Sequence, residues 1–465
     1  MVGLNPLFFK VTVFPASWCV RLCPDTAVCF DKGELMDPHT SVKARLASGS
    51  DRMLTVWAMT AAFSTYFCMY AFRKPFAVGT YEGVALLPGL PEMDLKILYI
   101  LAQVMGYAAS KFLGIKVVSE MPPGQRARAI GSFIGLAWLA LLLFAVLPAP
   151  WCALALVLNG LPLGMIWGLV FGFLEGRKVS DLLGAGLCAS FIVASGFVKS
   201  VGKWLMAANV TEAWMPFATG AIFLPPLALC LWMLSQVPAP TEADIAERTE
   251  RRPMNSAERK SFFGAHAPGL VLLVCGYVLL TAYRDFRDNF AREIWDALGY
   301  ADEPAILTTA ELPVAFGSLL AVAFIVRFKN NRNALLAIHA LMIAGAVLTG
   351  VATVLHGMGL LSSAAWMISV GVGLYLGYVP VNCVLFDRLI AAVGQVATAG
   401  FLIYVADASG YLGSVALLLY KNFGQPDLSW LGFFTGFSYA MSAVCTVCFV
   451  CSAVYFHRAT AERVS

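Results

Sequence analysis

The chain has 465 residues, of which 59% are hydrophobic and only 13% are charged, and its formal net charge is +4. This composition is typical of membrane proteins and excludes an ordinary soluble domain. The small positive charge gives no reason to expect a nucleic-acid partner. We therefore expect the lipid bilayer to be the surroundings of most of the chain.

Twelve apolar stretches follow one another along the chain, each near the length of about 20 residues that a helix needs to cross a bilayer. They lie at 54–77, 96–117, 128–148, 151–174, 182–206, 214–237, 268–291, 305–327, 333–355, 359–385, 394–420 and 429–456. The sequence predicts an all-α integral membrane protein with twelve transmembrane helices.

The segment before the first span, residues 1–52, does not read as a secretory signal. Its apolar run is interrupted by Lys10 and Pro15, and no small-residue cleavage site follows. We expect an N-terminal cytoplasmic tail there and a second cytoplasmic tail at residues 457–465.

Residues 238–266 change abruptly to a charged composition with few large apolar side chains. This change predicts a cytoplasmic linker between two bundles of six helices, at residues 53–237 and 267–456. Most of the 12 cysteines fall within the spans. We expect no disulfide framework, no metal site and no cofactor.

Lysine and arginine gather in alternate loops, and such loops stay on the cytoplasmic side of a membrane. The basic loops contain Lys116, Arg126, Arg128, Arg177, Lys178, Arg327, Lys329, Arg332 and Arg388. This bias predicts a multi-pass protein of the plasma (inner) membrane, with both termini in the cytoplasm.

The two halves repeat each other in sequence. The pattern FRxxFA of Phe72–Ala77 returns at Phe286–Ala291, and the ASG of the fifth span, at 194–196, returns in the eleventh at 408–410. Parallel six-helix repeats are the architecture of a large transporter fold that works by alternating access. The repeat makes Arg73 and Arg287 equivalent. Because arginine binds carboxylate and phosphate oxygens in bidentate fashion, we predict that this pair holds an anionic solute.

The same residues resemble the major facilitator superfamily, and within it the organophosphate:phosphate antiporters that carry glycerol-3-phosphate and hexose phosphates. Arg73–Phe76 is similar to their RKxF motif at the end of helix 1. Gly106–Glu120 is similar to the end of helix 2 and its loop, and Gly410–Ser414 to a segment of helix 11.

The resemblance implies that Arg73 and Lys111 bind substrate, together with Arg287 or, if the alignment slips, Arg284. Tyr70 belongs to the same tyrosine-rich segment. Three departures put phosphate in doubt. Ser190 stands where the antiporters carry a histidine, Ser119 and Glu120 replace an Asp-Arg pair, and helix 7 has acquired Asp285 and Asp288 beside its arginines.

Acidic residues inside the spans are candidates for gating or coupling. Asp285 and Asp288 lie beside the helix 7 arginines, where Arg284 and Asp288 are one turn apart and suited to pair. Asp407 and Glu311 lie in apolar surroundings and are candidates for proton coupling, or for structural hydrogen bonds to a neighbouring helix. We expect Lys199 and Lys203 to reach the outer interface.

A further set of charges lies at the predicted cytoplasmic ends of helices. We expect these residues to form ion pairs that hold those ends closed: Lys116, Glu120, Arg126, Arg128, Glu175, Arg177, Asp387 and Arg388.

Together these features predict a secondary transporter, not an enzyme, that exchanges a small organic anion or carries it with protons. A phosphorylated metabolite is the first candidate, and we expect a monomer. Two alternatives stay open: a proton-coupled carrier of a neutral or zwitterionic solute, and a sensor of the same fold that binds substrate without transporting it.

Overall fold

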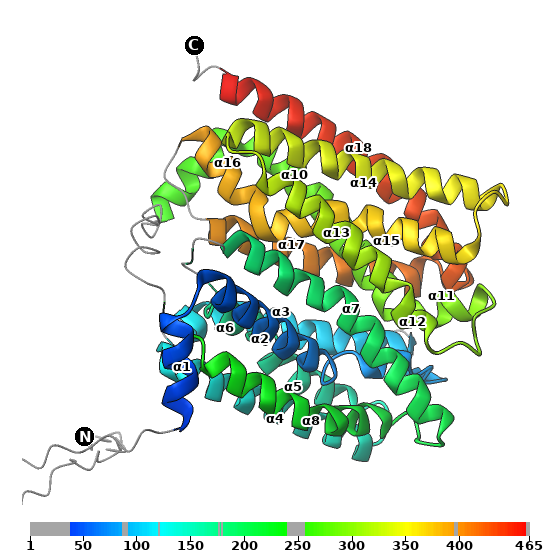
Figure 1. Ribbon diagram of the computed structural model, residues 1–465. Coiled ribbons are helices and arrows are strands. Elements are labelled where there is room, and N and C mark those ends of the chain that lie inside the picture. Colours follow the sequence, from blue (N-terminus) through cyan, green and yellow to red (C-terminus); the bar gives the residue numbers. More distant parts are fainter. Residues whose placement is uncertain are drawn as a thin grey trace, which may run out of the picture.

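The computed structural model describes residues 38–85, 92–119, 121–174, 177, 180–239, 256–394 and 399–461. Helices lie on all twelve predicted spans (Figure 1). Within the described residues, eight helical stretches are long enough and apolar enough to cross a membrane. Large apolar side chains such as Leu139, Phe316 and Val447 are exposed on the outside of the bundle, as expected for a surface that faces lipid.

The first half of the chain forms a group of helices with one short β-hairpin ahead of its second long span. Its elements are α1 (Pro38–Ser48), α2 (Asp51–Tyr70), η1 (Pro75–Val78), β1 (Val84–Ala85), β2 (Met93–Asp94), α3 (Leu95–Ser119), α4 (Pro123–Val146), α5 (Ala153–Leu163), α6 (Ile166–Phe171), α7 (Ser180–Ala207) and α8 (Met215–Ser235). The two-residue strands pair antiparallel, a small departure from the all-α prediction.

The second half follows the same plan without strands among its described residues. Its elements are α10 (Ser256–Asn289), α11 (Ala291–Ala297), α12 (Ile306–Thr309), α13 (Glu311–Val326), α14 (Asn331–Gly357), α15 (Ser363–Pro380), the π-helix η2 (Val381–Leu385), α16 (Phe386–Val393), α17 (Ala399–Leu419), the π-helix η3 (Tyr420–Gly424) and α18 (Trp430–Ala461).

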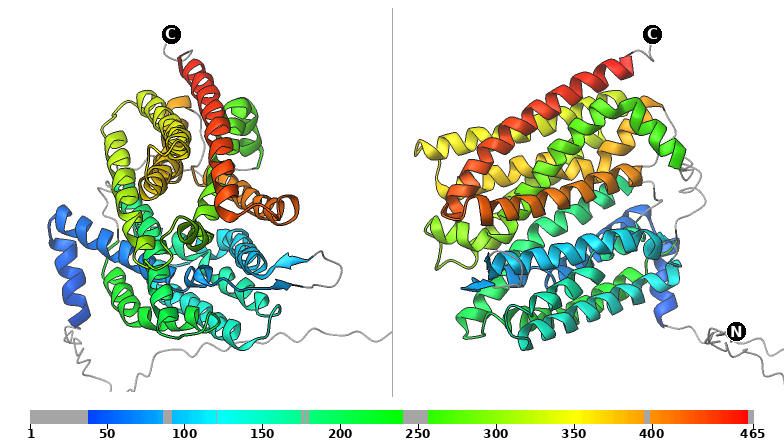
Figure 2. Two further views of the ribbon diagram at one scale, coloured as in Figure 1. Left: turned by 90° about the vertical axis from the view of Figure 1, so that its right-hand side faces the viewer. Right: turned by 180° about the vertical axis from the view of Figure 1, so that it is seen from behind.

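The two groups lie side by side, with the first half below the second in Figure 1 and in both views of Figure 2. Between them α7 contacts α12 and α13, and α3 contacts α17. At one end of the bundle, here named the α1 face, lie α1 and the last turns of α18. At the other end, the α11 face, lie η1, α11 and α12.

The first span does not run as one helix to residue 77 as predicted. Ser50 caps the N-terminus of α2 by accepting a hydrogen bond from the Met53 N–H. The helix ends at Tyr70, five residues ahead of Pro75, which has no N–H to continue the helical hydrogen bonds. The chain then turns through Lys74 into η1, so that Arg73 lies in a break rather than on a regular helix.

Part of the predicted linker is helical. Helix α10 begins at Ser256 and is kinked at His266, ahead of Pro268, so residues 256–266 are helical. Residues 1–37, 240–255 and 462–465, which carry the rest of the predicted tails and linker, lie outside the described residues.

Candidate functional site

Buried amides hold the backbone of Arg73 in place. Because α2 has ended, the carbonyls of Phe72 and Arg73 have no helical partners. Asn159 on α5 donates to the Phe72 carbonyl at 2.9 Å, and Gln103 on α3 donates to the Arg73 carbonyl at 2.8 Å. Gln103 also donates to the Asn159 side-chain oxygen at 2.8 Å. The two amides therefore hold the break in α2 from two neighbouring helices.

The Arg73 side chain is surrounded by tyrosines. Its guanidinium lies 3.8 Å from the ring centroid of Tyr107 and 5.9 Å from that of Tyr70. Tyr66 and Tyr411 are close enough to interact with it electrostatically. Arg73 is only 6% exposed, and its Nε has no hydrogen-bond partner. Within the described residues it forms no ion pair, so its charge is stabilised mainly by aromatic rings.

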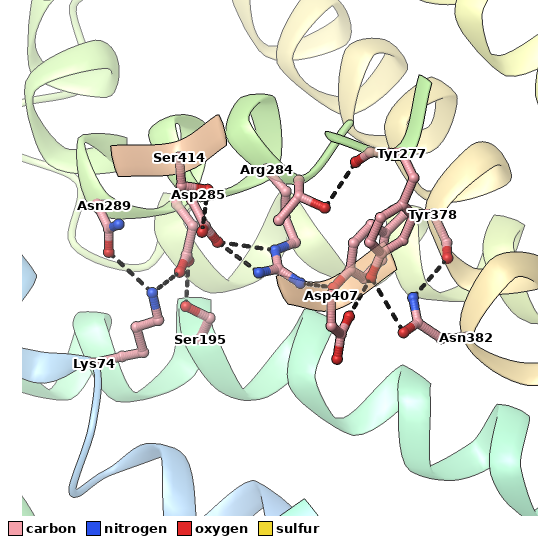
Figure 3. Close-up of polar contacts among 12 residues, drawn as sticks. Lys74, Ser195, Tyr277, Arg284, Asp285, Asn289, Tyr378, Asn382, Asp407 and Ser414 are labelled. Atoms are coloured by element: carbon pink, nitrogen blue, oxygen red, sulfur yellow. Dashed lines mark hydrogen bonds and ion pairs between the residues drawn. The ribbon is translucent and has the colours of Figure 1, made fainter. Parts of the chain in front are cut away.

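Lys111 lies next to this cage. Its ammonium is 5.4 Å from the same Tyr107 ring and 3.7 Å from the Asp407 carboxylate on α17. Asp407 also accepts a 2.7 Å hydrogen bond from the Tyr277 hydroxyl on α10 (Figure 3). The two predicted residues therefore meet in a contact that joins the halves.

Arg284 faces the same tyrosines from the second half. Its guanidinium donates to Asp285 through two nitrogens, at 2.6 and 3.1 Å, and lies 4.4 Å from the Tyr378 ring centroid (Figure 3). Ser414 on α17 donates to the other Asp285 oxygen at 2.7 Å. Tyr411 interacts electrostatically with both Arg284 and Arg73. Of the two candidate helix 7 arginines, Arg284 is the one that shares an aromatic neighbour with Arg73.

Arg287, the equivalent of Arg73 in the repeat, is instead neutralised inside the second half. It forms a 2.8 Å ion pair with Glu311 at the start of α13 and donates to the Met367 carbonyl at 3.2 Å. A Cβ at Gly371 would lie 2.8 Å from this guanidinium, so the glycine leaves the room that Arg287 needs. The predicted pairing of Arg73 and Arg287 around one anion is not seen in this arrangement.

Asp288 joins the halves and does not pair with Arg284, one turn away. Its carboxylate contacts Lys74 at 2.5 Å and also binds Lys199 and Ser195 on α7. Figure 3 shows how Lys74 and Ser195 lie close together here. Lys74 donates in addition to Asn289 at 2.9 Å. This set corrects two expectations from the sequence, because Asp288 has its partners in the other half and Lys199 is buried instead of reaching an interface.

More ion pairs between the halves lie towards the α11 face. Lys96 pairs with Glu293, and Lys203 pairs with Asp296 at 2.9 Å. Arg292 contacts Glu212 at 3.5 Å and donates to the Val78 carbonyl. These contacts hold the two halves together at this end.

Glu212, in the loop before α8, anchors the chain that follows η1. It accepts hydrogen bonds from the Thr80 N–H at 2.7 Å, the Thr80 hydroxyl at 2.9 Å and the Tyr81 N–H at 3.0 Å. Burial of the carboxyl raises its pKa, but these hydrogen bonds and the nearby Arg292 outweigh burial and bring the pKa below 4.5.

Other predicted residues lie elsewhere. Ser190 is buried and donates to the Leu187 carbonyl of its own helix at 2.6 Å. Arg126 donates to the Gly172 carbonyl, Arg177 to the Pro238 carbonyl and Arg388 to the Asn331 side chain at 2.9 Å. These three contacts, all towards the α1 face, are hydrogen bonds to neutral groups.

The predicted cytoplasmic ion pairs remain predictions. Arg128 is exposed on α4, and Asp387 lies in the first turn of α16. Glu120, Glu175 and the Lys116 side chain lie outside the described part of the chain.

Sequence reasoning did not assign Lys74, Ser195, Gln103 or Asn159 to the site. Lys74 was visible as a second cation beside Arg73. Asn159 and Gln103 were visible only as single polar residues within apolar spans, where hydrogen bonds to a neighbouring helix are expected.

Comparison with known proteins supports the fold. A model of a family of unknown function, DUF5690, matches residues 75–459, and the chain therefore belongs to that family. No curated protein matches the chain.

Three solved structures share the fold at low sequence identity. A D-xylose-proton symporter is 14% identical, with a TM-score of 0.58 over 85% of this chain and 96% of its own. A bacterial homologue of the human drug peptide transporters PepT1 and PepT2 is 14% identical, with a TM-score of 0.56 over 91% and 100%. A bacterial homologue of the iron transporter ferroportin, in its outward-facing state, is 15% identical, with a TM-score of 0.51 over 88% and 99%. The chain has the major facilitator fold of a multi-pass membrane protein, and the matched structures are transporters rather than enzymes.

Proposed function

We propose that this member of the DUF5690 family is a secondary transporter that moves a small organic anion by alternating access. The observation that carries the proposal is Arg73, a buried guanidinium without an acidic partner among the described residues. A buried charge without a counter-ion costs several kcal/mol. A substrate anion that enters the cage removes much of that cost, and this gain is a source of binding free energy.

The charge balance around Arg73 supports an anion. The central network contains six cations (Arg73, Lys74, Lys111, Lys199, Arg284 and Arg287) and four acids (Asp285, Asp288, Glu311 and Asp407). The four acids each have a cationic partner, which leaves an excess of two positive charges. One of these is Arg73, and the other arises because two lysines share Asp288.

Phosphate esters are the first substrates to test. Arg73 and Lys111 both lie against the Tyr107 ring, at 3.8 and 5.4 Å, so one small anion is able to reach both cations. A phosphate group offers more acceptor oxygens and more charge than a carboxylate, which suits a site with two excess positive charges. The resemblance of Arg73–Phe76 to the organophosphate:phosphate antiporters supports the same choice.

Alternating access gives the contacts between the halves a role. The ion pairs of Asp288, Glu293 and Asp296 with the first half have to break for the α11 face to open. The basic loops assign the α1 face to the cytoplasm, which makes the α11 face the outer side of the plasma membrane. Lys111 and Asp407 join the halves on the cytoplasmic side of Arg73 and have to part when that side opens.

The test is transport by the purified protein in liposomes preloaded with inorganic phosphate. We expect uptake of a labelled phosphate ester in exchange for internal phosphate, and loss of uptake in Arg73→Ala. Arg45→Ala is the matched control, because Arg45 is an exposed arginine on α1 that takes no part in the contacts between the halves. Full uptake by Arg73→Ala contradicts the proposal. Uptake of carboxylates but not of phosphate esters, with the same dependence on Arg73, supports an organic anion as the substrate and contradicts phosphate esters.

A proton-coupled carrier is the second candidate. It is favoured by the loose 3.7 Å contact of Lys111 with Asp407, whose side chains are 16% and 17% exposed. Separation of the halves removes the lysine and leaves the carboxylate without this cationic partner. Uptake driven by a pH gradient and abolished in Asp407→Asn supports this candidate. Substrate binding by the purified protein without flux in liposomes supports a sensor instead.

A further inference from the structure

Two thiols from different halves meet on the α1-face side of the site. The Cys188 Sγ on α7 lies 3.2 Å from the Cys383 Sγ on η2. Cys188 is completely buried, whereas Cys383 is partly exposed. The pair belongs to neither the tyrosine cage nor the ion pairs of Asp288, so the transport proposal leaves it unexplained.

The local structure brings Cys383 to this contact. Helix α15 ends at Pro380, and the chain continues as the π-helix Val381–Leu385. A π-turn contains one more residue than an α-turn and so changes the direction in which side chains point. The segment is held by Asn382, which donates to the Tyr378 carbonyl at 2.9 Å and accepts from the Tyr277 hydroxyl at 3.3 Å (Figure 3).

The position of the pair along α7 connects it to alternating access. Cys188 and Ser195 are seven residues apart on α7, or about 10 Å. The thiol contact therefore lies well to the α1-face side of the Ser195 contact with Asp288. Whenever the α1 face opens between α7 and η2, the two sulfurs have to separate.

We propose that Cys188 and Cys383 form a site of reversible oxidation, at which a disulfide locks the two halves together. A disulfide has an S–S length of about 2.05 Å, so the sulfurs have to approach by about 1 Å. A small movement of α7 against η2 achieves this. The bond traps the protein with its α1-face side closed and stops the transport cycle.

The chemistry needs only a small peroxide as oxidant. The Cys383 thiolate attacks one oxygen of hydrogen peroxide, the O–O bond breaks, and a sulfenic acid forms with release of water after protonation. The Cys188 thiol then attacks the sulfenic sulfur, and the S–S bond forms as the hydroxyl leaves as a second water. Two thiols are oxidised and one peroxide is reduced to two waters. A small thiol reverses the step by exchange.

The first test detects the bond without any transport assay. A protease site is placed between residues 240 and 255, which connect the halves, and the purified full-length protein is treated with hydrogen peroxide. After denaturation and cleavage we expect the halves to migrate together on a non-reducing gel and apart after reduction. Mass spectrometry is expected to find a peptide that links Cys188 with Cys383.

Variants keep the test decisive. Cys188→Ala and Cys383→Ala should each abolish the link, while Cys275→Ala should keep it, since Cys275 is an exposed cysteine on α10. Cys188→Ser is the second variant at the buried position, in case alanine lowers the yield of folded protein. The proposal is overturned if Cys275 is oxidised while the halves stay separable, or if the link persists in either alanine variant.

The second test measures transport. Peroxide should lower the uptake rate of the wild type at least tenfold, a reducing thiol should restore it, and Cys383→Ala should resist. If no substrate is ever found, the transport proposal fails while the gel test still decides the disulfide. Unchanged uptake in protein shown to be cross-linked contradicts the lock.

Discussion

The two halves carry an arginine at equivalent positions of an internal repeat but surround it differently. Arg287 is paired with Glu311 at 2.8 Å, and the ion pair lies within the second half. Arg73 has tyrosine rings around it and no acidic partner among the described residues. Both side chains are nearly completely buried, at 4% and 6% exposure. The difference therefore lies in the counter-charge and not in access to solvent.

This difference supports the proposal that Arg73 is the arginine available for binding, while Arg287 is neutralised within its own half. A neutralised arginine stabilises its own helix bundle and offers little to an incoming anion. An arginine held by aromatic faces keeps its charge available, because cation–π contacts occupy none of its N–H donors. The second half contributes Arg284 to the same aromatic surroundings, but Asp285 already holds that cation.

Removal of one partner of the Arg287–Glu311 pair should have the largest effect. Either Arg287→Met or Glu311→Leu leaves a buried charge unpaired, which should lower the free energy of unfolding by about 3 to 5 kcal/mol. The double variant should recover most of the loss. Thermal unfolding in detergent measures all four proteins as a double-mutant cycle. If the losses of unfolding free energy in the two single variants add up in the double variant, Arg287 and Glu311 are not coupled. The ion pair then does not account for the stability that Arg287 contributes.

Arg73→Met should show the opposite behaviour. No acid loses its partner, so the unfolding temperature should stay near that of the wild type or rise. Anion binding should weaken by roughly tenfold to 150-fold, the value of a charge-assisted hydrogen bond of about 1.5 to 3 kcal/mol. Titration of the purified protein with the transported anion measures this change. If Arg73→Met unfolds at a lower temperature than the wild type and binds the anion with unchanged affinity, Arg73 is a structural residue like Arg287.

The sequence predicted the helices well because each span is a local property of one stretch of the chain. Its pairing of Arg73 with Arg287 in the repeat stays a prediction. The sequence was not able to predict their surroundings, since Glu311 and Tyr107 reach them only through packing between helices. The contacts of Asp288 with Lys74 and Lys199 were invisible for the same reason. They depend on how one half rests against the other, which no pattern within a single helix encodes.

Asn159→Leu should disturb Arg73 without touching its charge. The change leaves the Phe72 and Ala137 carbonyls without their 2.9 Å donors and frees the backbone at the end of α2. We expect the KM for the anion to rise about tenfold while kcat changes less, since a displaced guanidinium loses about 1 to 2 kcal/mol of binding. Thr349→Val is the control, because Thr349 is a buried polar residue that bonds within its own helix. Equal changes in KM for both variants would show that Asn159 contributes to packing and does not position Arg73.

The smallest effect should come from Glu212. Its carboxylate accepts a hydrogen bond from the Thr80 N–H and so anchors the chain that follows Lys74 and η1. Its pKa lies below 4.5 in the folded protein, because N–H donors favour the carboxylate. The charged form therefore stabilises the fold above the ordinary pKa, and this contribution disappears as the pH falls through the lowered value. Solvent screens a carboxylate that is 33% exposed, so we expect about 1 kcal/mol or less. Unfolding temperatures of the wild type and Glu212→Gln should differ at pH 7 and converge as the pH falls below 4.5. No difference between the two proteins at pH 7 would show that the hydrogen bonds of Glu212 contribute nothing measurable to the fold.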